Sequence, residues 1–130
     1  MSTLKVNTIQ NTSGGSSSTP EQIETGRLKA WGSFKGSGTV SIHASYNFSS
    51  ITDISQGRYR LSFSNAMSDT NYAITANTMK GDANNDGNVK IQCGDNDGNP
   101  AVNTGNFNVQ VIHSHVDRAD PDKFWVMVAR

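Results

Sequence analysis

The sequence predicts an all-β fold: an antiparallel, jelly-roll-like β-sandwich with an extended N-terminal arm and one short helical turn. The first observation is composition, because the 130 residues include only three Leu and two Glu, against 11 Thr, 16 Ser, 14 Asn and 12 Gly. Leu and Glu favour helices, whereas Thr favours strands and Asn, Ser and Gly favour turns. The second observation is spacing. About eight strand-like segments are separated by turn residues roughly every 8–12 positions, as in sandwiches and barrels.

Charge and cysteine content exclude several classes of protein. Eleven basic residues balance eleven acidic ones, so the chain has no general attraction to nucleic acid or to an anionic membrane. The only cysteine, Cys93, excludes an internal disulfide, so packing or assembly must hold the fold. No apolar stretch is long enough to span a membrane, and residues 1–20 lack the pattern of a signal peptide. We therefore expect a protein that is made in the cytoplasm and does not insert into a membrane.

Residues 1–18 are expected to form an arm and a hinge in front of the sandwich domain, residues 19–130. The segment LKVNTIQ alternates like a strand, yet neither face is convincingly apolar, and the Gly/Ser-rich run NTSGGSSS follows at once. Such a strand can gain backbone hydrogen bonds by pairing with another molecule. Leu4, Val6 and Ile9 are its expected assembly contacts. An edge strand of the chain's own domain and a disordered terminus are the alternatives.

The segment STPEQIETG predicts the one helical turn. Thr19 suits the N-cap, Pro20 the first helical position, Gln22 the capping box and Gly26 the end.

The strands expected after this turn are, in order, LKAWGSF, TVSIHASYNF, RYRLSFSNAM, NYAITANTM, VKIQC, FNVQVIHSHV and KFWVMVAR. SSITDISQG is expected to be a connector, and the apolar run in KFWVMVAR predicts a buried closing strand. The expected core comprises Leu28, Val40, Ile42, Phe48, Leu61, Phe63, Ile74, Val111 and Val126.

Two loops rich in Asn, Asp and Gly, at 82–88 and 94–106, are the expected recognition surface, because a rigid scaffold holds their ends. The candidate contact residues are Asn84, Asn85, Asp86, Asn88, Asp95, Asn96, Asp97 and Asn99. Trp31 and Trp125 are further candidates for stacking on sugar rings, with core packing as the other interpretation.

Two patterns resemble metal sites only in part. Asp82-x-Asn84-x-Asp86-Gly matches the first half of a calcium loop, but Cys93 occupies the twelfth position, where a bidentate carboxylate is required. A turn between strands is the expected structure. His113 and His115 share one face of a strand, and we expect them to be polar surface residues. We therefore expect no metal and no cofactor.

The sequence carries no signature of an enzyme. It has no Gly-x-Ser-x-Gly elbow and no phosphate-binding glycine loop. Both glutamates, Glu21 and Glu24, fall on the helical turn rather than in a plausible cleft. We therefore expect a protein without catalytic activity.

Three blocks of the sequence carry a resemblance: STLKVNTIQNTSGG, GRLKAWGSFKGSGTVSI and YRLSFSNAMSDTNYAI. Together, over residues 2–74, the chain resembles a module of virion proteins of marine tailed phages, cyanophage-like proteins described as tail-fibre-like or virion structural proteins. The resemblance implies a location on the virion, capsid or tail proteins as partners, a homo-oligomer, most simply a trimer, and a host-surface glycan as a possible ligand. Some long phage tail fibres bind iron through His-x-His repeats along a trimer axis, and His113 and His115 form one such pair.

In this family the module often ends a longer fibre polypeptide, whereas here it begins at Met1. We therefore expect a small accessory subunit, such as a short spike or a fibre tip. A capsid decoration protein without a receptor role and a carbohydrate-binding adhesin are the alternatives.

Overall fold

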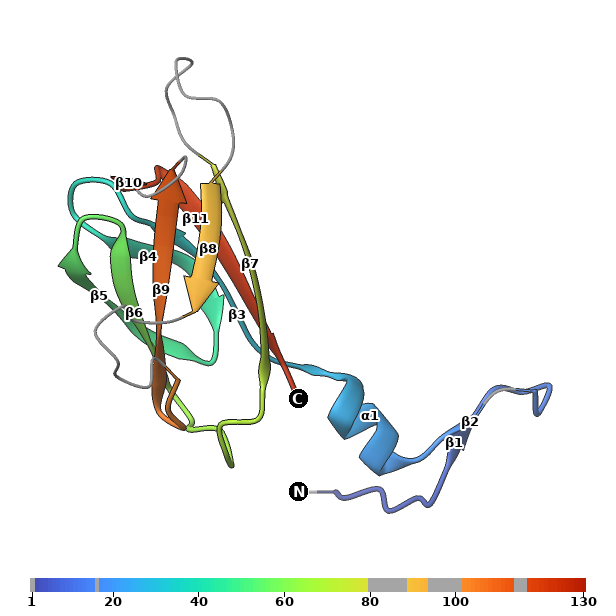
Figure 1. Cartoon of the computed structure of the whole chain (residues 1–130). Coiled ribbons are helices and arrows are strands. Elements are labelled where there is room, and N and C mark those ends of the chain that lie inside the picture. Colours follow the sequence, from blue (N-terminus) through green and yellow to red (C-terminus); the bar gives the residue numbers. More distant parts are fainter. Residues whose placement is uncertain (1, 16, 80–88, 94–101, 114–116) are drawn as a thin grey trace.

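The computed structural model describes residues 2–15, 17–79, 89–93, 102–113 and 117–130, which form a β-sandwich and a thin N-terminal arm (Figure 1). One sheet has the order β4–β3–β11–β7 and consists of β3 (Leu28–Lys35), β4 (Ser41–Tyr46), β7 (Ala73–Met79) and β11 (Lys123–Ala129). The other sheet consists of β5 (Phe48–Ser55), β6 (Arg58–Phe63), β8 (Val89–Cys93), β9 (Asn106–His113) and the two-residue β10 (Asp117–Arg118).

Every strand pair in the described residues is antiparallel, and the predicted antiparallel sandwich is confirmed. In the second sheet β6 lies between β5 and β9, while β8 and β10 also pair with β9. Three pairs of successive strands form hairpins, and in each hairpin both strands belong to the same sheet. These hairpins are β3–β4, β5–β6 and β8–β9. These hairpins distinguish the fold from a strict jelly roll, in which most successive strands lie in opposite sheets.

The core lies between the sheets and is built largely from aromatic rings. Phe34 stacks on Phe124 with ring centroids 5.1 Å apart, and Tyr59 stacks on the same ring at 5.2 Å. Phe48 stacks on Phe63 at 5.3 Å. The buried apolar residues are Ala30, Phe34, Phe48, Tyr59, Leu61, Phe63, Met67, Tyr72, Phe107, Val109, Val111, Phe124, Val126 and Val128.

Eight of the nine predicted core residues contribute to this core. Five are buried, and Val40, Ile42 and Ile74 are partly buried against them. Leu28 was wrongly assigned, because 43% of its surface is exposed. Val128 pairs with Ala30 but Ala129 pairs with Leu28, so the register shifts at this point. A β-bulge of this kind reverses which face a side chain occupies.

Asn47 divides the segment that was predicted as one long strand. Its φ of 59° is left-handed, and β4 ends before it while β5 begins after it in the other sheet. The Asn47 carboxamide donates to the carbonyl oxygens of Lys29 and Asn65, each at 3.1 Å, and accepts from the Asn65 N–H at 2.7 Å. These bonds hold the corner at which the chain passes from one sheet to the other. The segment SSITDISQG, which was expected to be a connector, is instead mostly strand β5.

A register shift in β4 changes its faces as well. Ser33 pairs with Ala44, whereas Phe34 pairs with Ile42, so β4 carries one extra residue. Ala44 and Tyr46, which alternation places inward with Ile42, are therefore exposed.

The predicted helical turn is confirmed as α1 (Pro20–Gly26). The Gln22 N–H donates to Thr19 Oγ1 at 3.2 Å, and the Thr19 N–H donates to Gln22 Oε1 at 2.9 Å. This reciprocal capping box satisfies backbone donors that the first helical turn cannot.

The arm is more ordered locally than a simple strand and hinge. Among the described residues of the predicted arm strand, Ile9 and Gln10 alone have strand pairing, as β1 (Ile9–Gln10). Their partner is β2 (Ser17–Ser18), which falls inside the predicted hinge. A turn joins them, in which the Gly14 N–H donates to the Asn11 carbonyl oxygen at 3.0 Å. The arm leaves the sandwich beside the C-terminus (Figure 1).

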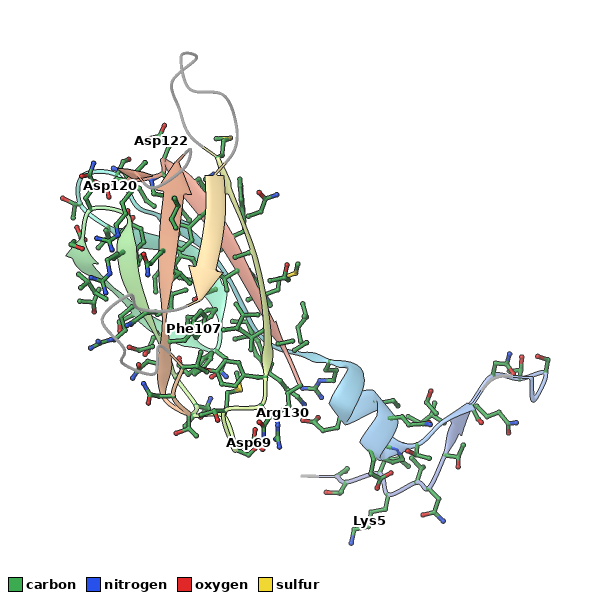
Figure 2. All side chains as sticks on the ribbon, in the orientation of Figure 1. Lys5, Asp69, Phe107, Asp120, Asp122 and Arg130 are labelled. Atoms are coloured by element: carbon green, nitrogen blue, oxygen red, sulfur yellow. The ribbon has the colours of Figure 1, made fainter. Side chains whose placement is uncertain are left out.

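The C-terminus itself is tied to the loop before β7. Arg130 forms an ion pair with Asp69 and a hydrogen bond with Ser68, and Figure 2 shows Arg130 and Asp69 side by side at this end of the sandwich.

Tyr59 ties the opposite end of the sandwich together. Its side chain is fully buried, and its hydroxyl lies 2.8 Å from Asp120 Oδ1 and 3.1 Å from the Gly36 carbonyl oxygen. Asp120 Oδ1 also accepts from the Gly57 N–H at 2.7 Å. Burial, and then the Asp120 carboxylate, raise the pKa of Tyr59 far above its ordinary value of 10.0.

The raised pKa of Tyr59 predicts a steep loss of stability at alkaline pH. Below pH 10 both the folded and unfolded chains keep the phenol proton, so the full stability is present. Above pH 10 the unfolded chain releases this proton while the folded chain retains it, so the free energy of unfolding should fall by about 1.4 kcal/mol per pH unit from this group. Tyr59→Phe should make the decline above pH 10 shallower in urea titrations. The control is Tyr46→Phe at an exposed tyrosine, and an equal slope in both variants would contradict the prediction.

Candidate functional site

The outer face of the sheet β4–β3–β11–β7 carries two rows of side chains, and each row runs across all four strands. The first row contains Tyr46, Trp31, Met127 and Thr75. The second row contains Ala44, Ser33, Trp125 and Asn77. The two tryptophans therefore lie on neighbouring strands, diagonally across the register.

Both tryptophan side chains are open to solvent, so core packing is not their role. Trp31 is 42% exposed and Trp125 is 39% exposed. Within the described part of the chain, neither indole stacks on another ring and neither indole N–H has a hydrogen-bond partner. Relative to the described residues, each indole thus offers an unstacked aromatic face and an N–H donor without a partner.

The members of both rows on β3, β11 and β7 line a groove of about 810 Å³. Its lining residues are Leu28, Trp31, Gly32, Ser33, Thr75, Ala76, Asn77, Trp125, Val126 and Met127. None of these described lining residues is ionisable, and they offer apolar surface, amide groups and hydroxyl groups. A mostly apolar hollow with a few polar groups is the usual form of a small-ligand site.

The closing strand β11 explains why this face is apolar. It lies centrally between β3 and β7, and Phe124, Val126 and Val128 point into the core. Its other face carries Trp125 and Met127, which are exposed. The prediction that this strand is buried thus holds for one face only. Alternation along KFWVMVAR is the signal that separates the two faces.

The arm presents the second apolar surface. Leu4 is 85% exposed, and Val6 and Ile9 are also exposed, as is Ile23 of α1. A shallow hollow separates the arm from α1 and is lined by all four of these side chains. Lys5 projects from the arm away from the sandwich (Figure 2).

Most residues of the two predicted recognition loops lie outside the described residues. These are Asp82, Asn84, Asn85, Asp86, Asn88, Asp95, Asn96, Asp97 and Asn99, together with His115 of the histidine pair. The last part of the second loop, residues 102–106, is described and is held to the sandwich. The Asn103 carbonyl oxygen accepts from the Tyr72 hydroxyl at 2.8 Å, and the Thr104 carbonyl oxygen accepts from the Met67 N–H at 2.8 Å.

His113 ends β9, where its backbone pairs with both Val89 of β8 and Asp117 of β10. Among the residues that the structure describes, no three His, Cys, Asp or Glu side chains gather as a metal site would require. In the same residues, no helix has the length and apolar character needed to cross a membrane.

Comparison with known proteins adds no relative, since no family model, curated protein or solved structure matches the chain. The geometry leaves two candidate binding surfaces. One is the aromatic groove, defined by the ten lining residues named above, and the other is the exposed arm.

Proposed function

We propose that this chain is a non-enzymatic structural subunit of a bacteriophage virion, a tail-fibre-like or capsid accessory protein that assembles as a homotrimer. The observation that carries the proposal is the arm, whose apolar side chains lie outside the sandwich of their own chain. The resemblance of residues 2–74 to phage virion modules supports the same role.

The arm is suited to contact a neighbouring subunit. In the described residues its strand β1 pairs only with β2, and Leu4, Val6 and Ile9 remain exposed. Burial of apolar surface is the main favourable contribution to protein association. A neighbouring chain can supply that burial, as well as backbone hydrogen bonds to residues 2–8, which have no strand pairing in the described residues.

The assembly proposal predicts that polar substitutions in the arm dissociate the trimer. The wild-type protein should sediment at about three times the chain mass of 14.0 kDa. Replacing Leu4, Val6 and Ile9 together by Ser should shift it to the mass of one chain, because the buried apolar contacts are lost. The circular dichroism spectrum should stay that of a β protein. The control is Asn7→Ser with Thr8→Ser, which changes the same stretch without removing apolar side chains.

A wild-type protein that sediments as a single chain would contradict the oligomer. A serine variant that still sediments as a trimer would contradict the role of the arm.

The virion role is tested on purified particles of the phage that encodes the chain. Gold-labelled antibodies raised against the protein should mark the particles in electron micrographs. Label on the tail would favour the fibre-like role, whereas label spread over the capsid would favour decoration. Particles without label would contradict the proposal.

A further inference from the structure

We propose that the aromatic groove is a binding site for a neutral saccharide. The inference goes beyond the virion role, because it concerns a surface of the isolated chain and holds wherever the protein is located. It also places saccharide recognition on the outer sheet face rather than in the Asn-rich loops.

The two indoles provide the apolar half of the recognition. Trp31 and Trp125 occupy diagonal positions on paired antiparallel strands, where neighbours lie about 7–8 Å apart and their Cβ atoms somewhat closer. Their exposed faces can pack against the C–H faces of sugar rings, which are apolar although the ring edges carry hydroxyl groups. Met127 pairs with Trp31 in the register and also lines the groove, where its flexible side chain can adapt to a ligand.

Polar groups beside the indoles provide the other half. The Asn77 Oδ1 atom accepts from the Thr78 N–H at 2.8 Å, which orients the carboxamide and leaves its two N–H donors without a partner in the described residues. The hydroxyl groups of Ser33 and Thr75 also line the groove, and neither has a partner in that part of the chain. Sugar hydroxyls both donate and accept, so a mixture of amide, indole and hydroxyl groups suits them.

The lack of charged side chains in the groove lining favours neutral ligands over anionic ones. The lining residues that the structure describes include no ionisable side chain, so a phosphate, a uronic acid or an acidic peptide would meet no opposite charge inside the groove itself. Lys35 and Lys123 face outward on the same strands but lie beyond this lining. A purely apolar partner would cover Asn77, Ser33 and Thr75 and leave these polar groups buried without hydrogen bonds, which is unfavourable. A neutral ligand with apolar faces and hydroxyl edges satisfies both parts of the surface.

The groove is preorganised for such a ligand. All the indole, amide and hydroxyl groups named here lie on the paired strands β3, β7 and β11, which the sandwich core holds from behind. Side chains on rigid elements lose less freedom on binding.

The experiment uses the full-length protein on an array of neutral oligosaccharides (hexose and N-acetylhexosamine chains) and anionic ones (uronic and sialic acid chains). Neutral oligosaccharides that bind on the array are then titrated against the protein in solution. Trp31 and Trp125 are the only tryptophans of the chain, so intrinsic tryptophan fluorescence reports from the groove alone. We expect neutral chains to bind and to change the emission.

Variants identify the site. Trp31→Ala and Trp125→Ala should each lower the association constant about tenfold or more, since stacking on one indole is lost. Asn77→Ala should also weaken binding. Trp31→Phe and Trp125→Phe keep an aromatic face but remove the indole N–H, so they should weaken binding less than Ala does, and each leaves one tryptophan as reporter. The control is Ile54→Ala, at an exposed apolar residue of β5 in the other sheet.

Absence of neutral-glycan binding on the array would overturn the inference, and so would binding of anionic chains alone. Binding that the tryptophan variants leave unchanged would place the site elsewhere. A change in sedimentation mass caused by Trp31→Ala or Trp125→Ala without any sugar would instead identify the face as an interface between copies. Each of these results is independent of whether the protein is found on virions.

Discussion

Replacing Phe34 by Ala should lower the free energy of unfolding by about 3–5 kcal/mol, the usual cost of removing a buried phenylalanine. Phe34 is fully buried, stacks on Phe124 and meets the edge of Phe48 with ring centroids 5.4 Å apart. Gly32 makes room for this ring, since a Cβ there would lie 2.3 Å from the Phe34 Cζ atom. The loss should appear in urea unfolding as a lower midpoint with a similar slope.

The matched control for Phe34→Ala is Trp31→Ala, three residues earlier on β3. Trp31 is the larger side chain but faces outward, so its removal should cost about 1 kcal/mol or less. Comparable losses in the two variants would show that the outer face contributes to the core as much as the inner face does.

Gly57→Ala should destabilise the sandwich by about 3 kcal/mol or more, because two independent costs coincide. Gly57 has a φ of 65°, which costs a residue with a Cβ about 1–2 kcal/mol. An added Cβ would also lie 2.8 Å from the Val111 carbonyl oxygen and 2.9 Å from the Ala119 nitrogen. These are backbone atoms of neighbouring segments, which cannot rotate away as a side chain can.

Gly38→Ala separates the two costs of Gly57→Ala. Gly38 has a similar φ of 61°, but an added Cβ would meet nothing within 4 Å. Its substitution should therefore cost only the strain of about 1–2 kcal/mol. Thermal unfolding of the two variants measures the difference, and equal losses would mean that the Val111 contact relaxes at no cost.

Features that depend on near neighbours in the chain could be predicted from the sequence. The Thr19 cap and Gln22 were recognised because a capping box needs only residues three positions apart. Strands β3, β6 and β11 were recognised because a half-buried strand alternates with period two. The absence of an internal disulfide follows directly from the single Cys93.

Features that depend on partners distant in the chain could not be predicted from the sequence. Leu28 and Tyr46 fit the inward pattern of their segments, but bulges opposite β11 and β3 turned them outward. Asn47 could be read as an ordinary strand residue until Lys29 and Asn65 were seen to accept its hydrogen bonds.

The aromatic groove shows the same division. The sequence alone determined that Trp31 and Trp125 stand on strands, on the faces opposite to Phe34 and Phe124, because alternation is a property of the extended backbone. It could not determine which of those faces the rest of the chain would cover. Only the tertiary structure decided this, because the second sheet packs on the side of Phe34 and Phe124 and leaves both tryptophans exposed. Burial depends on how whole sheets pack against each other, and no local pattern along a strand contains that information.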